Sequence, residues 1–119
     1  MRATAFLGLV LCMAARSVFA QLTDPPAQLE WKLAPGAFEE LCFELDAGRS
    51  MRYAFDAGAP LEFNLHWHRG SAIVFPIKRA AVDRRAGVFR SETREAYCLM
   101  WTNRGRAPVA LRARIDRGD

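Results

Sequence analysis

The order of apolar and polar residues along the chain is that of short β-strands. In 61–68 the two kinds alternate: Leu61, Phe63, Leu65 and Trp67 against Glu62, Asn64, His66 and His68. A period of two places the two sets on opposite faces of a strand. The segment therefore predicts a strand with one buried face and one face toward water.

The segment 95–103 differs because both of its faces are largely apolar. Tyr97, Leu99 and Trp101 point one way, and Cys98, Met100 and Thr102 point the other way. Neither set is polar enough to be fully solvated, so both faces need a cover. We predict that 95–103 is the central strand of the fold, with a neighbour on each edge.

The remaining strands are shorter or less regular. An edge-type strand is predicted at 29–33, and further strands at 51–56, 71–77, 87–90 and 109–115. Pro76 cannot donate a ladder hydrogen bond and indicates an edge or a bulge. The segment 38–46 fits both a strand and one face of a helix. We favour a strand, because a turn at 47–50 would then join it to 51–56 as a hairpin.

The segments between these strands read as turns or connections. Turn residues at 56–60 and 103–106 should reverse the chain, and the polar, basic segment 78–86 should be a connection with a short helical turn at 79–82. The pattern predicts an all-β fold, an antiparallel β-sandwich or jelly-roll of about eight short strands. Its predicted core is Tyr53, Phe55, Phe63, Leu65, Trp67, Leu99 and Trp101. An exposed Trp101 would instead indicate a binding surface.

The first 20 residues have the pattern of a secretory signal peptide. A short charged start precedes an apolar run to Ala15, and Val18-Phe19-Ala20 offers small residues for cleavage after Ala20. The alternative is a retained N-terminal membrane anchor. With cleavage, 21–28 is an extended leader, 29–119 is a single domain, and no membrane span remains. The protein is then expected to be exported, either periplasmic or secreted.

Two cysteines, Cys42 and Cys98, remain after cleavage. An even count in a small exported domain predicts a disulfide, and two free buried thiols are the alternative. Zinc bound by cysteines alone is not expected, because there is no CxxC pair.

Charge and residue types exclude several functions. Cleavage would remove Arg2 and Arg16 and lower the net charge from +4 to +2. The basic residues are scattered along the sequence, which indicates a solvated surface and not a nucleic-acid site. The few serines lie outside a Gly-x-Ser-x-Gly motif, and no phosphate-binding glycine loop is present. We therefore predict no enzyme activity and no cofactor.

The cysteine-containing segments resemble a known family. Glu40-Leu41-Cys42-Phe43-Glu44, a later Gly87-Val88-Phe89, and Tyr97-Cys98-Leu99-Met100-Trp101-Thr102-Asn103 are similar to the GOLD (Golgi dynamics) domain over residues 29–115. The resemblance implies a small β-sandwich with a disulfide between an early and a late strand. It also implies a module that binds a protein or a small ligand, here in a stand-alone version whose composition looks bacterial.

The alternative function is metal binding by His66 and His68. Residues two apart on a strand project from the same face, so the two imidazoles could bind one copper or zinc ion. A stable site needs further ligands, and the candidates are Asn64, Glu62, Met100 and Met51. The simpler interpretation is that both histidines belong to the solvated face of their strand.

Overall fold

The computed structural model describes residues 21–118, and the signal peptide predicted at 1–20 lies outside the described residues. Six strands form the fold: β1 (Ala27–Leu33), β2 (Phe38–Leu45), β3 (Ser50–Arg69), β4 (Ala72–Arg90), β5 (Glu95–Thr102) and β6 (Val109–Arg117). Within 21–118 no helix has the length and apolar character needed to cross a membrane.

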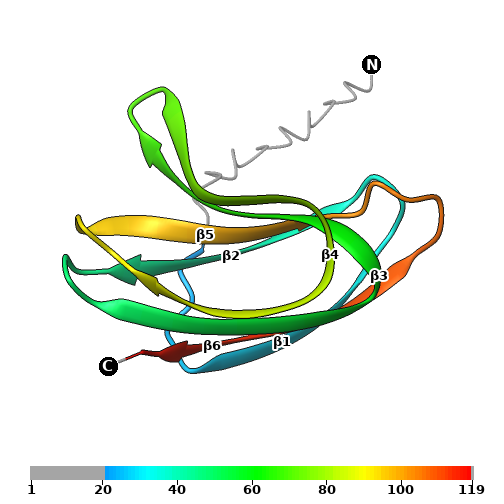
Figure 1. The fold of residues 1–119 in the computed structure, drawn as a ribbon, viewed down its shortest axis with the longest axis horizontal. Helices are drawn as coiled ribbons and strands as arrows, with labels where there is room; N and C mark the ends of the chain where they lie inside the picture. Colours follow the sequence, from blue (N-terminus) through cyan, green and yellow to red (C-terminus); the bar gives the residue numbers. More distant parts are fainter. Residues whose placement is uncertain (1–20, 119) are drawn as a thin grey trace, which may run out of the picture.

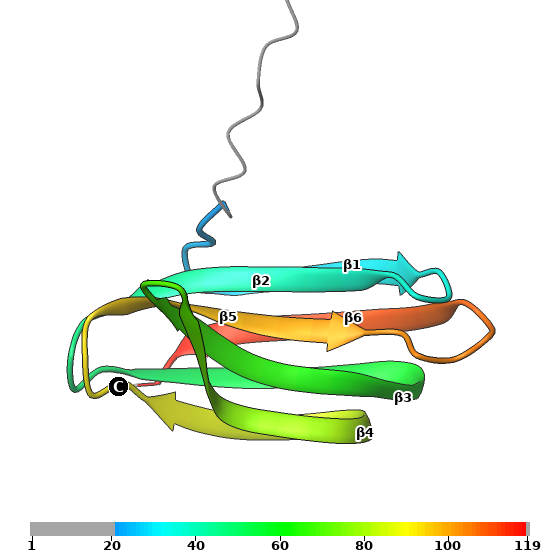
Figure 2. The same cartoon turned by 90° about the horizontal axis from the view of Figure 1, so that it is seen from above.

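The strands form one antiparallel sheet that curls upon itself. Their order is β1-β6-β3-β5-β2, and β4 pairs with β3 off this path. The sheet curls because β3 changes its partner: its first arm, Met51–Ala57, pairs with β6, and its second arm, Glu62–His66, pairs with β5. As a result the β2–β5 end of the sheet faces the β1–β6 end (Figures 1 and 2).

The turn predicted at 56–60 is wrong, because the chain bends there and does not reverse. In the β3–β4 pairing Asp56 lies opposite Arg84 and Leu61 lies opposite Val82, so β3 holds extra residues between these two pairs. Gly58 and Pro60 lie in this irregular stretch, where a strand can bend and lose ladder hydrogen bonds. The two short strands predicted at 51–56 and 61–68 are therefore the two arms of one bent strand.

The connection and helical turn predicted at 78–86 are also wrong. This segment belongs to β4, which follows β3 around the bend and joins the strands predicted at 71–77 and 87–90. Its polar sequence has a physical reason: β4 is paired on one side only, and edge strands often carry charged residues that discourage further pairing. The sheet consequently has six strands instead of about eight.

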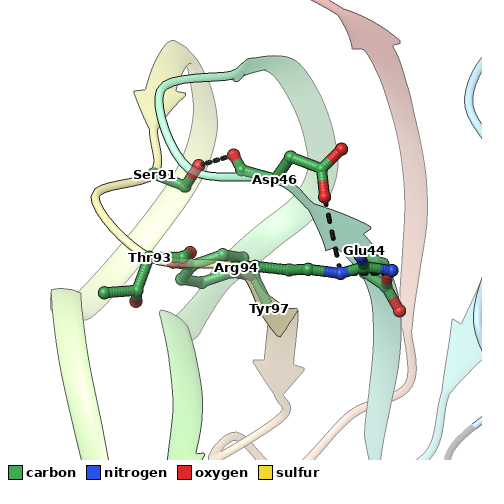
Figure 3. A network of polar contacts seen from close by, with 6 residues as sticks. All are labelled: Glu44, Asp46, Ser91, Thr93, Arg94 and Tyr97. Atoms are coloured by element: carbon green, nitrogen blue, oxygen red, sulfur yellow. Dashed lines mark hydrogen bonds and ion pairs between the residues drawn. The ribbon is translucent and has the colours of Figure 1, made fainter.

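The hairpin predicted between 38–46 and 51–56 is wrong as well, although 38–46 does form a strand. β2 pairs with β5, from Phe38 opposite Thr102 to Leu45 opposite Glu95. The β2–β3 turn is instead bound to the β4–β5 connection, where the Ser91 hydroxyl donates to the Asp46 carbonyl and Arg94 Nε lies 3.4 Å from Asp46 Oδ1 (Figure 3). These contacts let the turn lead from one layer of the curl to the other.

The core lies inside the curl, and its predicted members are confirmed. All seven predicted core residues are buried, with at most 9% of any one exposed. Trp101 on β5 is fully buried against Trp31 on β1 and Phe55 on β3, with ring centroids 5.8 and 5.5 Å apart. Trp101 therefore joins the two ends of the sheet, and the alternative of an exposed binding tryptophan is wrong.

Several features of the central and outer strands are confirmed. β5 pairs with β2 on one edge and β3 on the other, whereas β1 pairs only with β6. The bulge near Pro76 is present, since Leu65 lies opposite Ile77 and Trp67 lies opposite Val74. The predicted leader contributes its last two residues to β1 and forms a bridge between Leu22 and Cys42.

Candidate functional site: the histidine face

The candidate site is on the outer face of the sheet, away from the core, over β2, β5 and the second arm of β3. Asn64 and His66 alternate there with the core residue Leu65. In the strand register Asn64 lies opposite Met100, which lies opposite Glu40. His66 lies in the adjacent row, opposite Cys98. We call the group Glu40, Asn64, His66 and His68 the histidine face.

The row that contains His66 also contains the disulfide. Cys42 and Cys98 are directly paired residues of β2 and β5, their Cα atoms are 4.1 Å apart, and their sulfurs are bonded. The predicted disulfide is confirmed. It joins the two strands on the same side of the sheet as His66 and fixes the backbone from which Glu40 projects.

His66 is buried and makes two polar contacts. Its Nε2 lies 3.0 Å from Glu40 Oε1, and its Nδ1 lies 2.7 Å from Asn64 Oδ1. Only 5% of the residue is exposed, so these contacts replace the hydrogen bonds that water would otherwise make. The predicted solvated strand face is therefore wrong for His66 and Asn64, since both lie beneath neighbouring side chains.

The protonation of His66 depends on two opposing effects. Burial lowers its pKa from the ordinary value of 6.5, because a charged ring loses hydration. The negative charge of Glu40 acts in the opposite direction, and a positive charge on His68 would lower the pKa further. The net shift of the pKa is downward. A neutral ring carries one N–H, so it can donate to Glu40 Oε1 or to Asn64 Oδ1 but not to both at once.

His68 is the accessible member of the predicted metal pair. It is exposed, and its ring centroid lies 5.5 Å from that of His66. A shared ion would require a ring nitrogen of His66 to leave Glu40 or Asn64. Metal binding at His66 and His68 therefore stays a prediction, and it carries the cost of breaking a buried contact.

The structure separates the other proposed ligands. Met51 is buried in the core on the first arm of β3, so the suggestion that it completes the site is wrong. Glu62 is paired with Arg104 at 3.2 Å. Met100 lies in the same row as Asn64. Another group with metal-ligand geometry in 21–118, Glu40 with Cys42 and Cys98, has both sulfurs in the disulfide.

The sequence analysis missed Glu40 as the partner of His66. The available signal was in 38–46: a strand there places Glu40 and Cys42 on one face, and a Cys42–Cys98 disulfide aligns that strand with 95–103. The missing step was the pairing of β5 with the second arm of β3, which sequence periodicity does not contain.

Beyond the histidine face, β3 and β4 continue as a hairpin that extends past the rest of the sheet (Figure 1). The pairing of β3 with β5 ends at His66, whereas β3 and β4 remain paired to Arg69 opposite Ala72. Two large apolar residues near the tip are exposed, Ile73 at 48% and Phe75 at 42%. Large exposed apolar groups on a projecting element indicate a contact surface.

Comparisons with known proteins show a shared fold. No protein-family model and no curated protein matches the chain. Among solved structures, the periplasmic g-type lysozyme inhibitor PliG of Aeromonas hydrophila is similar with a TM-score of 0.52 and 16% identity, over 82% of this chain and 93% of that one. PirA is similar with a TM-score of 0.51 and 12% identity, over 78% and 96%. Each match spans most of the other protein's length. At these identities the two matches show the fold alone.

Proposed function

We propose that this chain is an exported, non-catalytic module that binds another protein, as an inhibitor does. The observation that carries the proposal is the likeness of its fold to a periplasmic inhibitor of g-type lysozyme, over 93% of that inhibitor. The disulfide supports export, because disulfides persist in oxidising compartments. The GOLD resemblance stays part of this proposal and is supported by the bond between an early and a late strand.

The chemistry of the histidine face supports a non-catalytic role. The contact between Glu40 and His66 resembles the orienting group and base of a catalytic site. However, the other ring nitrogen of His66 faces Asn64 and not a hydroxyl or thiol nucleophile. The only cysteines in the described residues are joined to each other. The arrangement fits a buried structural network.

The β3–β4 hairpin is the binding surface that we assign to this function. Its tip projects beyond His66, where the pairing of β3 with β5 ends, and it presents Ile73 and Phe75. Cations lie beside the aromatic rings of its stem: Arg69 over Trp67 at 5.1 Å and Lys78 over Phe75 at 5.0 Å. The exposed aromatic Phe75 and the nearby Arg69 match the composition of protein–protein contact sites, in which aromatic residues and arginine are enriched.

The test is direct binding to a g-type lysozyme, measured by biolayer interferometry, together with the rate at which the enzyme clears a suspension of bacterial cells. We expect a 1:1 complex and slower clearing. Ile73→Ser/Phe75→Ser should weaken binding by at least about tenfold, because exposed apolar anchors dominate such contacts.

The matched control is Val88→Ser, which removes an apolar side chain that is 63% exposed elsewhere on β4. It should bind as the original protein does. Absence of binding at about 10 μM, far above the range of specific complexes, would contradict the inhibitor proposal. Equal weakening in both variants would contradict the assignment of the hairpin.

A metal site at His66 and His68 is the second candidate, favoured by the 5.5 Å separation of the two rings. Isothermal titration with copper and zinc would test it, on the original protein and on His66→Ala/His68→Ala. Binding tighter than about 10 μM that the double variant loses would support the site. Equal binding by both proteins would end this hypothesis.

A further inference from the structure

A second surface lies on the outer face of the other layer, over β6, the first arm of β3 and the end of β4. In the strand register Arg114 and Ala86 flank Ala54, and Arg112 and Arg84 flank Asp56. Arg52 lies two residues before Ala54 on β3, so it is on the same face. The four exposed arginines Arg52, Arg84, Arg112 and Arg114 therefore surround Ala54, and we call them the arginine face.

This arrangement corrects the expectation of scattered basic residues. The sequence places Arg52, Arg84 and Arg112 far apart. Because the sequence analysis put Arg84 in a connection and not in a strand, it did not predict that these residues share a face. The antiparallel pairing of β3 with both β4 and β6 brings them to one face.

The arginine face contains three adjoining hollows of about 500, 330 and 550 Å³. Arg84, Asp56 and Arg112 line the first two, and Ala54, Ala86 and Arg114 line the second and third. The small residues Ala54 and Ala86 lie between the arginines in the strand register. A ligand can therefore approach these small residues while several guanidinium groups reach it from the sides.

Two of the four arginines contact neighbouring groups, and two do not. Arg112 lies 3.7 Å from Asp56, and Arg52 donates a hydrogen bond to the Arg117 carbonyl. Arg84 and Arg114 have neither an ion pair nor a hydrogen bond with any residue in 21–118. Two guanidinium groups thus have no partner within 21–118, on a face that also carries the carboxylates Asp56, Asp83, Asp116 and Glu30, the last of them opposite Arg112 in the β1–β6 register.

The exposure of these arginines determines which anion can bind. A single ion pair between exposed groups contributes little to binding in water, so an isolated charge would not remain bound. Arg112 and Arg114 are two residues apart, about 7 Å along a strand, and Arg84 is two strands from Arg112, about 10 Å away. A ligand with several linked anionic groups can contact more than one of them at once.

We propose that the arginine face is a binding site for a soluble ligand that carries a chain of phosphate groups. Guanidinium groups form paired hydrogen bonds with phosphate oxygens. A soluble ligand fits better than a membrane surface, because the hollows are lined by small residues and the exposed large apolar residue beside them is Val88. This site is independent of the proposed inhibitor hairpin, which lies on the other arm of β3.

The test is isothermal titration of the purified protein with sodium tripolyphosphate. Inorganic phosphate, which has a single phosphate group, is the comparison. We expect 1:1 binding of tripolyphosphate, at least about tenfold tighter than phosphate and weaker at higher salt. Arg84→Gln/Arg114→Gln should weaken tripolyphosphate binding by at least about tenfold. Ala86→Glu, which adds a negative charge between the arginines, should weaken it similarly.

The matched control is Arg79→Gln/Arg106→Gln, which changes the net charge equally away from the arginine face. It should keep the original affinity, and equal thermal midpoints should verify folding of all variants. Equal weakening in the control would show nonspecific attraction and overturn the site. Absence of tripolyphosphate binding would overturn it too, including when poly-glutamate or phosphatidylglycerol vesicles bind.

Discussion

The two outer faces of the curled sheet use polar residues in opposite ways, although β3 contributes to both. On the histidine face Asn64 and His66 are buried and contact each other, and His66 also contacts Glu40. On the arginine face Arg84 and Arg114 are exposed and unpaired within 21–118. Buried polar groups must be satisfied internally and so help to fix the structure, whereas exposed unpaired cations remain available for a ligand.

The largest effect should come from breaking the disulfide that lies beside His66 on the same side of the sheet. Cys42→Ala/Cys98→Ala should lower the free energy of unfolding by about 4 kcal/mol, because the disulfide closes a long loop in the unfolded chain. Guanidinium chloride denaturation would measure this. Reduction of the original protein should cause a similar loss. A loss below about 1 kcal/mol would contradict the assigned role of this link.

The disulfide also shows how far the sequence could predict the fold. Alternation identified β5 and β6, and cysteine count with export identified the Cys42–Cys98 bond. The bend of β3 was missed because Gly58 and Pro60 have the same local preferences whether a chain reverses or bends. The pairing of β2 with β5 was missed because partner choice depends on contacts between segments distant in sequence.

The same limit applies to the two sites. His66 and His68 were identified as neighbours from their spacing, but their surroundings were not. Glu40 reaches His66 across β5, and Arg84 approaches Arg114 only through pairing on both edges of β3. Residue types indicated the chemistry, while the nonlocal register decided which groups are paired.

A substitution beneath the arginine face should test whether that layer is as firmly packed as the other. A Cβ added at Gly87 would lie 2.7 Å from the hydroxyl oxygen of buried Tyr53, which accepts a hydrogen bond from Arg85. Gly87→Ala should lower the free energy of unfolding by about 1 to 3 kcal/mol through overpacking. Urea denaturation would measure the change.

The matched control for that substitution is Gly58→Ala. No atom lies within 4 Å of the added Cβ, so stability should change by less than about 1 kcal/mol. Equal effects of the two substitutions would show that Tyr53 yields easily, and that the arginine layer is loosely packed.

A smaller effect, the pH dependence of the free energy of unfolding, should distinguish the histidine face from the arginine face. Burial lowers the pKa of His66 below 6.5, so the unfolded chain binds more protons between that lowered pKa and about 6.5. The free energy of unfolding should therefore fall as the pH falls through this window, by at most about 1.4 kcal/mol per pH unit. Below the lowered pKa this loss stops.

The difference between the original protein and His66→Gln isolates that contribution from the titration of carboxylates. The variant should have a flatter stability profile in the window, measured by denaturation at a series of pH values. His68→Gln should keep most of the slope, because the positive charge of His68 is a lesser cause of the shift than burial. Identical profiles for the original protein and His66→Gln would contradict the lowering of the His66 pKa by burial.

The smallest change in stability should come from the arginine face, although its effect on ligand binding is expected to be large. Arg84→Gln/Arg114→Gln removes two exposed cations and no ion pair, so the free energy of unfolding should change by less than about 1 kcal/mol. Repulsion among the four arginines is offset by the nearby carboxylates Asp56, Asp83 and Asp116, so the change should be small at both low and high salt. Thermal unfolding at two salt concentrations would measure both values. A loss well above 1 kcal/mol would mean that these arginines, like His66 and Asn64, fix the structure, and the contrast between the two faces would then be wrong.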